Sequence, residues 1–170
     1  MPLPYQTNDP FATLPPHPSA ERAHDQEELL SRSLATLFGD IDPAGLALLR
    51  QQLEWVEVAG GQTLMRQGDP GDAMFLVISG RLRAYMAGDD DAPRLLREMA
   101  RGQIVGELSL ITDAPRSATV LALRDSVLVR LGKPAFLRLL AGSGELSLAM
   151  TRQIVRRMQP PSRSRLAWRR

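Results

Sequence analysis

The chain has 170 residues, of which 44% are hydrophobic and 24% are charged, a composition typical of one soluble domain with a buried core. It contains no cysteine, and its two histidines, His17 and His24, lie in a proline-rich N-terminal segment, which argues against disulfide scaffolds, thiolate or histidine metal centres and histidine-dependent hydrolases. The net charge of +2 is unevenly distributed, because seven of the 21 basic residues and none of the 19 acidic residues follow residue 150.

The N-terminal segment is predicted to be disordered rather than a secretion signal. Six prolines occur in residues 1–20, and residues 1–25 are predicted to form a disordered leader. The longest uninterrupted apolar run in the chain, residues 73–78, is too short to span a bilayer. Because neither a signal peptide nor a spanning segment is found, a cytoplasmic location is expected.

Two helices are predicted after this leader. From residue 26, leucines at positions 30, 34 and 37 recur at helical spacing, and Gly39 is expected to end the first helix. Asp42 and Pro43 are typical of an N-cap and a first helical position. Leucines at positions 46, 49 and 53 then mark one face of the second helix.

The pattern changes at Trp55 to short runs of β-forming residues, with glycine or aspartate in the turns between them. Strands are predicted at residues 55–59, 63–67, 73–79, 82–87, 94–101, 117–123 and 126–131. Such closely spaced strands favour a sandwich or barrel of antiparallel strands over alternating βαβ units. We therefore predict a mainly β fold with flanking helices.

Helical periodicity returns after Leu131. Helices are predicted over residues 133–141 and 145–159, and the proline pair at 160–161 ends the second one. An apolar stripe on the second helix can pack on the core, pair two copies in a homodimer or close over a ligand. Residues 160–170 are predicted to be an arginine-rich linker or tail, with contact to an anionic membrane as an alternative. The stripe consists of Leu146, Met150, Ile154 and Met158.

Three sequence signals of common enzymes are absent. The only glycines four residues apart, Gly102 and Gly106, flank isoleucine rather than the serine of a nucleophile elbow. Proline follows Gly132 and Lys133, which excludes a phosphate loop of the Gly-Lys-Ser/Thr type. Ser147 stands where a dinucleotide fingerprint begun at Gly142 would need its third glycine. We therefore expect that this chain is not an enzyme and holds no cofactor or metal.

One segment, residues 105–120, combines groups that bind anions. Gly106 permits a sharp turn into about one helical turn, whose N-terminal N–H groups favour an anion. Arg116 follows a proline at the start of the next predicted strand, with the hydroxyl of Ser117 beside it. The segment is predicted to form a pocket edge, with the carboxylate of Glu107 nine residues before the arginine.

A cyclic nucleotide fits this set of groups. Arginine and backbone amides suit a singly charged phosphodiester, which a guanidinium holds through two parallel hydrogen bonds. A carboxylate beside a phosphate makes sense when it accepts a hydrogen bond from a hydroxyl such as the ribose 2′-OH. The alternatives are that Glu107 only favours the helix dipole and that Arg116 only pairs with Glu107.

The sequence Gly-Glu-Leu-Ser-Leu-Ile at residues 106–111, followed by Pro-Arg-Ser-Ala-Thr-Val at 115–120, resembles the phosphate-binding cassette of cyclic nucleotide-binding domains, as in catabolite activator protein and protein kinase regulatory subunits. The resemblance implies an antiparallel β-roll or jelly roll with N-terminal and C-terminal helices over residues 26–159. It also implies that Glu107 binds the ribose hydroxyl and that Arg116 with Ser117 binds the cyclic phosphate. The predicted ligand-binding residues are Gly106, Glu107, Leu108, Pro115, Arg116 and Ser117.

Two features depart from the family pattern. Val105 stands where the family often has an aromatic residue. The C-terminal helix stops at the proline pair, whereas in catabolite activator protein this helix continues, contacts the base and pairs two subunits. Ser162 and Met158 are alternatives for a base contact, and Ser117 is compatible with both nucleotides. The sequence therefore does not decide between cAMP and cGMP as the ligand.

The regulated partner is expected to lie outside this chain. Eleven residues follow Gln159, fewer than the roughly 50–70 that a helix-turn-helix needs, so no specific DNA binding is expected. Residues 94–131 look most like the N-terminal sensor of bacterial patatin-like phospholipases related to neuropathy target esterase, which implies an attached lipid-hydrolase domain. The alternatives are a sensor fragment of a catabolite-activator-type transcription regulator and a ligand-free interaction module. The presence of both Glu107 and Arg116 argues against the last of these.

Overall fold

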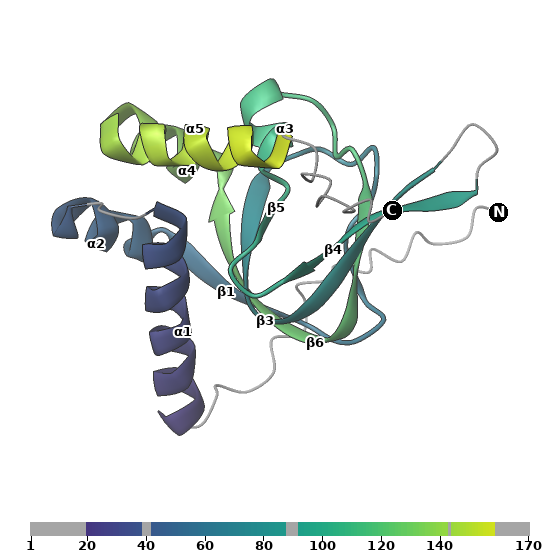
Figure 1. The fold of residues 1–170 in the computed structure, drawn as a ribbon, viewed down its shortest axis with the longest axis horizontal. Coiled ribbons are helices and arrows are strands. Elements are labelled where there is room, and N and C mark those ends of the chain that lie inside the picture. Colours follow the sequence, from purple (N-terminus) through teal and green to yellow (C-terminus); the bar gives the residue numbers. More distant parts are fainter. Residues whose placement is uncertain (1–19, 39–41, 88–91, 143, 159–170) are drawn as a thin grey trace, which may run out of the picture.

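The computed structural model describes residues 20–38, 42–87, 92–142 and 144–158 (Figure 1). Its helices are α1 (Ala20–Phe38), α2 (Pro43–Gln51), α3 (Glu107–Thr112), α4 (Lys133–Gly142) and α5 (Gly144–Met158). Its strands are β1 (Leu53–Val58), β2 (Thr63–Met65), β3 (Ala73–Ala87), β4 (Pro93–Ala100), β5 (Ile104–Val105) and β6 (Thr119–Gly132).

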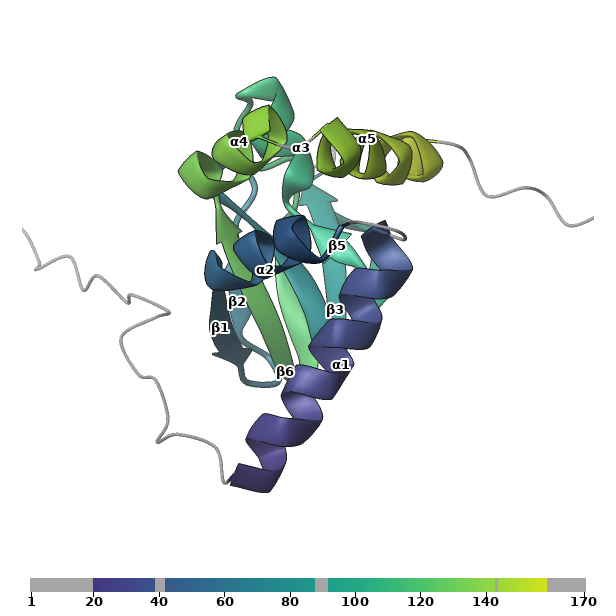
Figure 2. The same ribbon diagram turned by 90° about the vertical axis from the view of Figure 1, so that its left-hand side faces the viewer.

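The strands form one curved antiparallel sheet in the order β1-β6-β3-β4, with β2 paired to β6 and β5 paired to β3. Helices α1, α2, α4 and α5 lie on one side of this sheet, and the β3–β4 hairpin projects from the opposite side (Figure 1). Figure 2 shows α1 and α2 in front of the sheet and α4 and α5 at one end of it. This arrangement confirms the predicted antiparallel β-roll with N-terminal and C-terminal helices.

Strands β3 and β6 are each continuous, although the sequence predicts a break in the first at Gly80 and in the second at residues 124–125. The register of β3 against β6 shifts on both sides of Gly80, which has a φ of 97°, so the strand bends through an irregularity without losing its partner. A Cβ atom at Gly80 would lie 2.2 Å from Oγ of Ser126 in β6. This glycine marks a close approach of two strands rather than a strand end.

Other boundaries also differ from the sequence prediction. Helix α1 begins at Ala20, so the predicted leader, which ends at residue 25, overlaps the helix. Residues 20–25 lack the leucine repeat, but alanine and glutamate among them favour helix on their own. Strand β5 is too short to produce a periodic pattern and was not predicted. The predicted disorder of residues 1–19 and the predicted tail at 160–170 lie outside the described residues.

The buried side chains form two clusters, one on each face of the sheet. Successive residues of the apolar run 73–78 belong to the two clusters in turn. Because the strand is buried on both faces, its sequence is continuously apolar. The cluster under the helices includes Leu34, Leu49, Met74, Leu76, Ile78, Phe136 and Met150. The cluster inside the roll includes Phe75, Val77, Leu82, Met99, Val120 and Leu128.

The helical segments follow most of the local signals in the sequence, but Leu53, predicted on the second helix, is the first residue of β1, because α2 ends at Gln51. Oδ1 of Asp42 accepts a hydrogen bond from the N–H of Gly45 at 2.9 Å, and Pro43 is the first residue of α2, as predicted. On α5, Met150 packs into the cluster under the helices, as expected for a core residue. The other three stripe side chains lie outside the described part of the molecule, so the homodimer and the ligand-closing helix stay predictions.

Replacement of Gly71 by alanine is expected to destabilise the domain by about 1–3 kcal/mol, the usual range for overpacking. A Cβ atom at this position in the β2–β3 loop would lie 2.0 Å from Cβ of Ser109 in α3, so the loop and the helix would have to separate. Urea unfolding measures the loss. Gly144→Ala is the matched control, because nothing lies within 4 Å of its added Cβ. Equal stabilities of the two variants would contradict the close contact.

Candidate functional site

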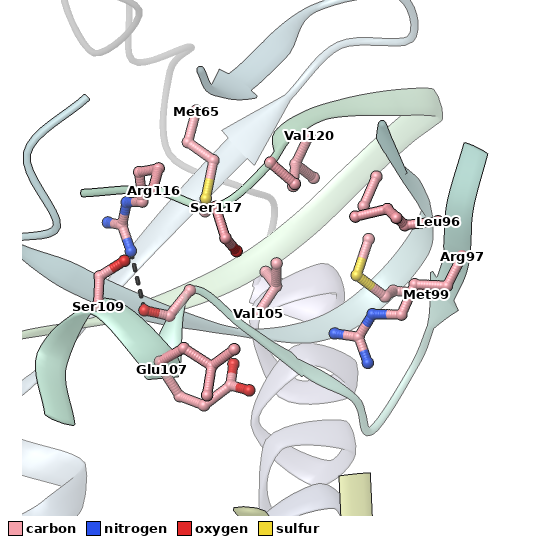
Figure 3. A pocket seen from close by; sticks show the side chains of 14 residues that line it. Met65, Leu96, Arg97, Met99, Val105, Glu107, Ser109, Arg116, Ser117 and Val120 are labelled. Atoms are coloured by element: carbon pink, nitrogen blue, oxygen red, sulfur yellow. Dashed lines mark hydrogen bonds between the residues drawn. The ribbon is translucent and has the colours of Figure 1, made fainter. Parts of the chain in front are cut away.

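A pocket of about 270 Å³ lies beside α3, with its floor on the inner face of the roll (Figure 3). The side chains of Met65, Met99, Val105 and Val120 make much of this floor apolar. Polar groups come from three places: the start of α3, strand β4 and the segment that leads into β6. These polar lining residues are Arg97, Glu107, Ser109, Arg116 and Ser117.

The turn into α3 depends on glycine. Gly106 is the N-cap of α3 and has a φ of 84°, a conformation that side-chain-bearing residues rarely adopt. A Cβ atom there would lie 2.5 Å from Nη1 of Arg116. Without it, Nη1 donates a hydrogen bond to the carbonyl oxygen of Gly106 at 2.9 Å, the dashed line in Figure 3. The missing side chain therefore lets the arginine lie against the backbone of the turn.

Arg116 is almost completely buried, with an exposed fraction of 4%. Its backbone is held by the β2–β3 loop: its N–H donates to the carbonyl of Asp69 at 2.8 Å, and its carbonyl accepts from the N–H of Gly68 at 2.9 Å. Its Nη2 atom is 3.4 Å from Oδ1 of Asp72. Burial lowers the pKa of this guanidinium from its usual value, and the charge of Asp72 opposes that shift.

Glu107, the first residue of α3, is also buried, with an exposed fraction of 3%. Burial raises the pKa of its carboxyl, while a backbone hydrogen bond and the charges of Arg97 and Arg116 act in the opposite direction. In Figure 3 the two guanidiniums lie toward opposite ends of the pocket, with the carboxylate of Glu107 between them. The site thus holds one buried acid between two arginines.

The other predicted site residues take different positions. The side chains of Leu108 and Ser117 are exposed and line the pocket. Pro115 is exposed and lies outside the lining, and its carbonyl oxygen accepts a hydrogen bond from Oγ of Ser109 at 3.4 Å. The fold therefore brings five of the six predicted residues to one cavity, whereas the proline shapes the chain before Arg116.

Three lining residues on β4, Leu96, Arg97 and Met99, are not among the site residues that the sequence predicted. The register between β3 and β4 shifts after Ala84, so Ala84 faces Arg97 whereas the next β3 residue faces Leu95. This irregularity brings both Leu96 and Arg97 to the pocket. Arg97 stands two residues before the buried Met99 and therefore on the same, inward face of the strand. This spacing was the only sequence signal for Arg97, and it can be used only once the strand register is known.

Arg97 is partly buried in this position. Its Nη2 atom donates a hydrogen bond to the carbonyl of Ile104 at 3.3 Å. Burial lowers the pKa of its guanidinium, and the charge of Glu107 raises it. A second cation therefore lines the pocket at a distance from Arg116.

Among the residues that the structure describes, no group of three or more histidine, cysteine, aspartate or glutamate side chains is arranged to hold a metal ion. None of the described helices is long and apolar enough to cross a bilayer. The expected absence of a cofactor and the expected cytoplasmic location stay predictions.

Comparison with known proteins identifies the family. Residues 55–143 match the cyclic nucleotide-binding domain family, which is more than half of the chain. The chain therefore belongs to this family, as the cassette resemblance predicted. It is 32% identical over 151 residues to lysophospholipase nte1 of Aspergillus oryzae and 30% identical over 144 residues to that of Neurospora crassa. These matches cover 89% and 85% of this chain but only 10% of either lysophospholipase.

Solved structures agree with this assignment. The N-terminal domain of a transcriptional regulator from Streptomyces coelicolor is 33% identical, with a TM-score of 0.62 over 72% of this chain and 87% of that one. Catabolite activator protein from Thermus thermophilus is 27% identical, with a TM-score of 0.67 over 72% of this chain and 57% of that one. The regulatory subunit of a cAMP-independent protein kinase A from Trypanosoma brucei, 20% identical with a TM-score of 0.68 over 83% of this chain and 50% of that one, shares the fold.

Glu107→Gln is expected to raise the melting temperature at neutral pH. Burial raises the pKa of Glu107 in the folded state, so the folded chain binds more protons than the unfolded chain between the two pKa values. Stability is therefore lost as pH rises from the unfolded value, about 4.3, through the folded one. The gain from glutamine should disappear below that window.

Thermal unfolding at a series of pH values measures this difference. Glu57→Gln, at an exposed position on β1, is the matched control and should change the melting temperature little at any pH. A lower melting temperature of Glu107→Gln at neutral pH would show that the partners of the carboxylate outweigh its desolvation.

Proposed function

We propose that this domain binds a 3′,5′-cyclic nucleotide in the pocket beside α3. The observation that carries the proposal is that two oppositely charged side chains, Glu107 and Arg116, line one cavity although each is almost completely buried. Burying charges of either sign costs folding free energy unless they are paired or hydrogen-bonded. A cyclic nucleotide supplies an anion for the arginine and a free ribose hydroxyl for the carboxylate within one compact ligand.

In this proposal Arg116 and Ser117 bind the cyclic phosphate, with the N–H groups of residues 106–108. Nη1 of Arg116 is held by Gly106, whereas its Nη2 has only a long contact, 3.4 Å, to a carboxylate outside the pocket. A phosphodiester oxygen would replace that contact by a shorter charged hydrogen bond. Glu107 accepts a hydrogen bond from the ribose 2′-OH. Because Arg116 also contacts Gly106 and Asp72, its position does not depend on Glu107 alone.

The base would lie toward β4, where Leu96 and Arg97 line the pocket. An arginine only donates hydrogen bonds, and the O6 and N7 atoms of guanine both accept them. Adenine places its N6 donor beside N7 instead, so one of the two bonds is lost. Arg97 therefore favours cGMP over cAMP, a choice that the sequence left open.

The lysophospholipase relatives support a role for the domain in a larger protein. The chain spans about a tenth of their length, so the activity of the whole protein is part of the proposal. We expect this domain to control an attached lysophospholipase-type domain, to be non-catalytic itself and to act in the cytoplasm without specific DNA binding.

A second candidate is the sensor of a transcription regulator, which the 33% identity to the Streptomyces coelicolor domain favours. The coding sequence downstream of residue 170 distinguishes the two. A Gly-x-Ser-x-Gly elbow there would support the hydrolase, and a helix-turn-helix would support the regulator.

Arg116→Ala is expected to weaken cyclic nucleotide binding by roughly 2–5 kcal/mol, the usual loss for one partner of a buried charged pair. Glu107→Ala is expected to cost less, around 1.5–3 kcal/mol, as for a hydrogen bond to a charged group. Isothermal titration calorimetry against cAMP and cGMP measures both losses.

Two exposed positions provide controls for these variants. Arg101→Ala and Glu57→Ala remove the same charges from the surface and should leave the affinity unchanged. The site assignment is wrong if Arg116→Ala and Glu107→Ala bind like the wild-type protein. The ligand-free interaction module is supported instead if the wild-type protein binds neither nucleotide.

Arg97→Met is expected to lower the affinity for cGMP by about 1–3 kcal/mol, the discrimination of one bidentate contact to guanine, and to leave cAMP nearly unaffected. Methionine retains the apolar stem that lines the pocket. The same titrations compare the two nucleotides. An equal loss for both would place the arginine near the sugar or phosphate rather than the base.

A further inference from the structure

Asp72, in the loop before β3, lies between two arginines. Its Oδ1 atom is 3.4 Å from Nη2 of Arg116, which lines the pocket, and its Oδ2 atom is 3.0 Å from Nη2 of Arg130, which lies outside it. The side chain of Asp72 is 70% exposed, whereas that of Arg116 is 4% exposed. One carboxylate is thus shared between the phosphate site and a cation outside the site, and the outer contact is the shorter one.

The strands fix this arrangement. Arg130 of β6 faces Glu54 of β1 in the sheet register, and its Nη1 atom is 3.0 Å from Oε2 of that glutamate. The carbonyl of Asp72 accepts a hydrogen bond from the N–H of Lys133, the first residue of α4, at 2.7 Å. Both partners of the outer ion pair are therefore positioned by their own backbones.

An anion in the pocket changes what the Asp72 carboxylate does. Without a ligand, Asp72 partly neutralises the buried Arg116, and its charge raises the pKa of that guanidinium against the effect of burial. A phosphodiester bound to Arg116 takes over this neutralisation and brings a second negative charge toward Asp72. Two anions that share one guanidinium repel each other. The repulsion is smaller when another cation holds the carboxylate.

We propose that Arg130, although outside the pocket, is a positioning residue for the phosphate site, because it holds Asp72 and thereby leaves Arg116 to an anionic ligand. This inference rests on the proposed nucleotide binding and extends it to a residue that does not touch the ligand. The positioning effect of Arg130 runs through Asp72 and requires the carboxylate, whereas the charge of Arg130 also acts directly on Arg116 and lowers the pKa of that guanidinium.

Arg130→Met removes the cation and keeps the apolar stem. We expect cyclic nucleotide to bind about two- to fivefold more weakly in calorimetry, the range for ion pairs with an exposed partner. Asp72→Asn added to this variant is expected to restore the wild-type affinity or exceed it, because the competing carboxylate is then absent. The weakening is expected to shrink as salt is added, since Asp72 is exposed.

Arg138→Met is the matched control. Arg138, on α4, lines the same surface hollow as Arg130, but its Nη2 donates to Oε1 of Gln52 at 3.2 Å rather than to Asp72. We expect this variant to bind like the wild-type protein. Equal weakening in both variants would show that binding is weakened only by the general loss of a positive charge. Failure of Asp72→Asn to restore binding would show that Arg130 acts on the fold and not through the carboxylate. Either result overturns the inference.

A measurement without nucleotide separates this inference from the proposed function. In Arg130→Met, Asp72 is left to Arg116 alone, so the NMR signals of the Arg116 guanidinium should shift, and their protons should exchange more slowly with solvent. Adding Asp72→Asn should reverse both changes and carry them past the wild-type values, because the wild-type contact between Asp72 and Arg116 is then lost as well. If the wild-type protein binds neither cAMP nor cGMP, the proposed function fails. If the Arg116 signals are the same in wild type and Arg130→Met, the inference about Arg130 fails.

Discussion

The site depends on one hydrogen bond, from Nη1 of Arg116 to the carbonyl oxygen of Gly106. This bond holds a buried guanidinium against the turn that begins α3, and it exists because no side chain stands at Gly106. Glu107, the next residue, is buried on the wall of the same cavity, where desolvation raises its pKa while the nearby arginines lower it. The carboxylate of Glu107 and the guanidinium of Arg116 are thus buried in the same cavity, which costs folding free energy. A ligand with an anionic group and a hydroxyl would offset that cost.

The β-roll supplies the rigid frame for this arrangement. Strands β3 and β6 pair along most of their lengths and carry one apolar cluster on each face. Except for Arg97 on β4, the polar site residues lie on the short segments that connect the strands, and backbone hydrogen bonds between Arg116 and the loop at Gly68 and Asp69 hold these segments together. The precision of the site therefore comes from loop-to-loop hydrogen bonds on a sheet that is buried on both faces.

The same contacts connect the pocket to the C-terminal helices. Asp72 contacts Arg116 through its side chain and Lys133, the first residue of α4, through its carbonyl. Lys133 also forms an ion pair with Asp113, the C-cap of α3. The loop before β3 and the end of α3 thus both contact Lys133 at the start of α4.

The sequence by itself determined the fold class, the cap at Asp42 and five of the residues that line the cavity, because these depend on local conformation and on a cassette whose members are close in the chain. It was wrong about the break at Gly80, since a glycine that ends a strand and one that admits a close neighbouring strand look alike in sequence. It was also wrong about the break at residues 124–125, through which β6 continues. Only the tertiary structure decided that Arg97 reaches the pocket and that Asp72 lies between two arginines. The position of Arg97 follows from an irregular register between β3 and β4. The position of Asp72 follows from contacts with arginines 44 and 58 residues further along the chain. Neither feature leaves a periodic signal in the sequence.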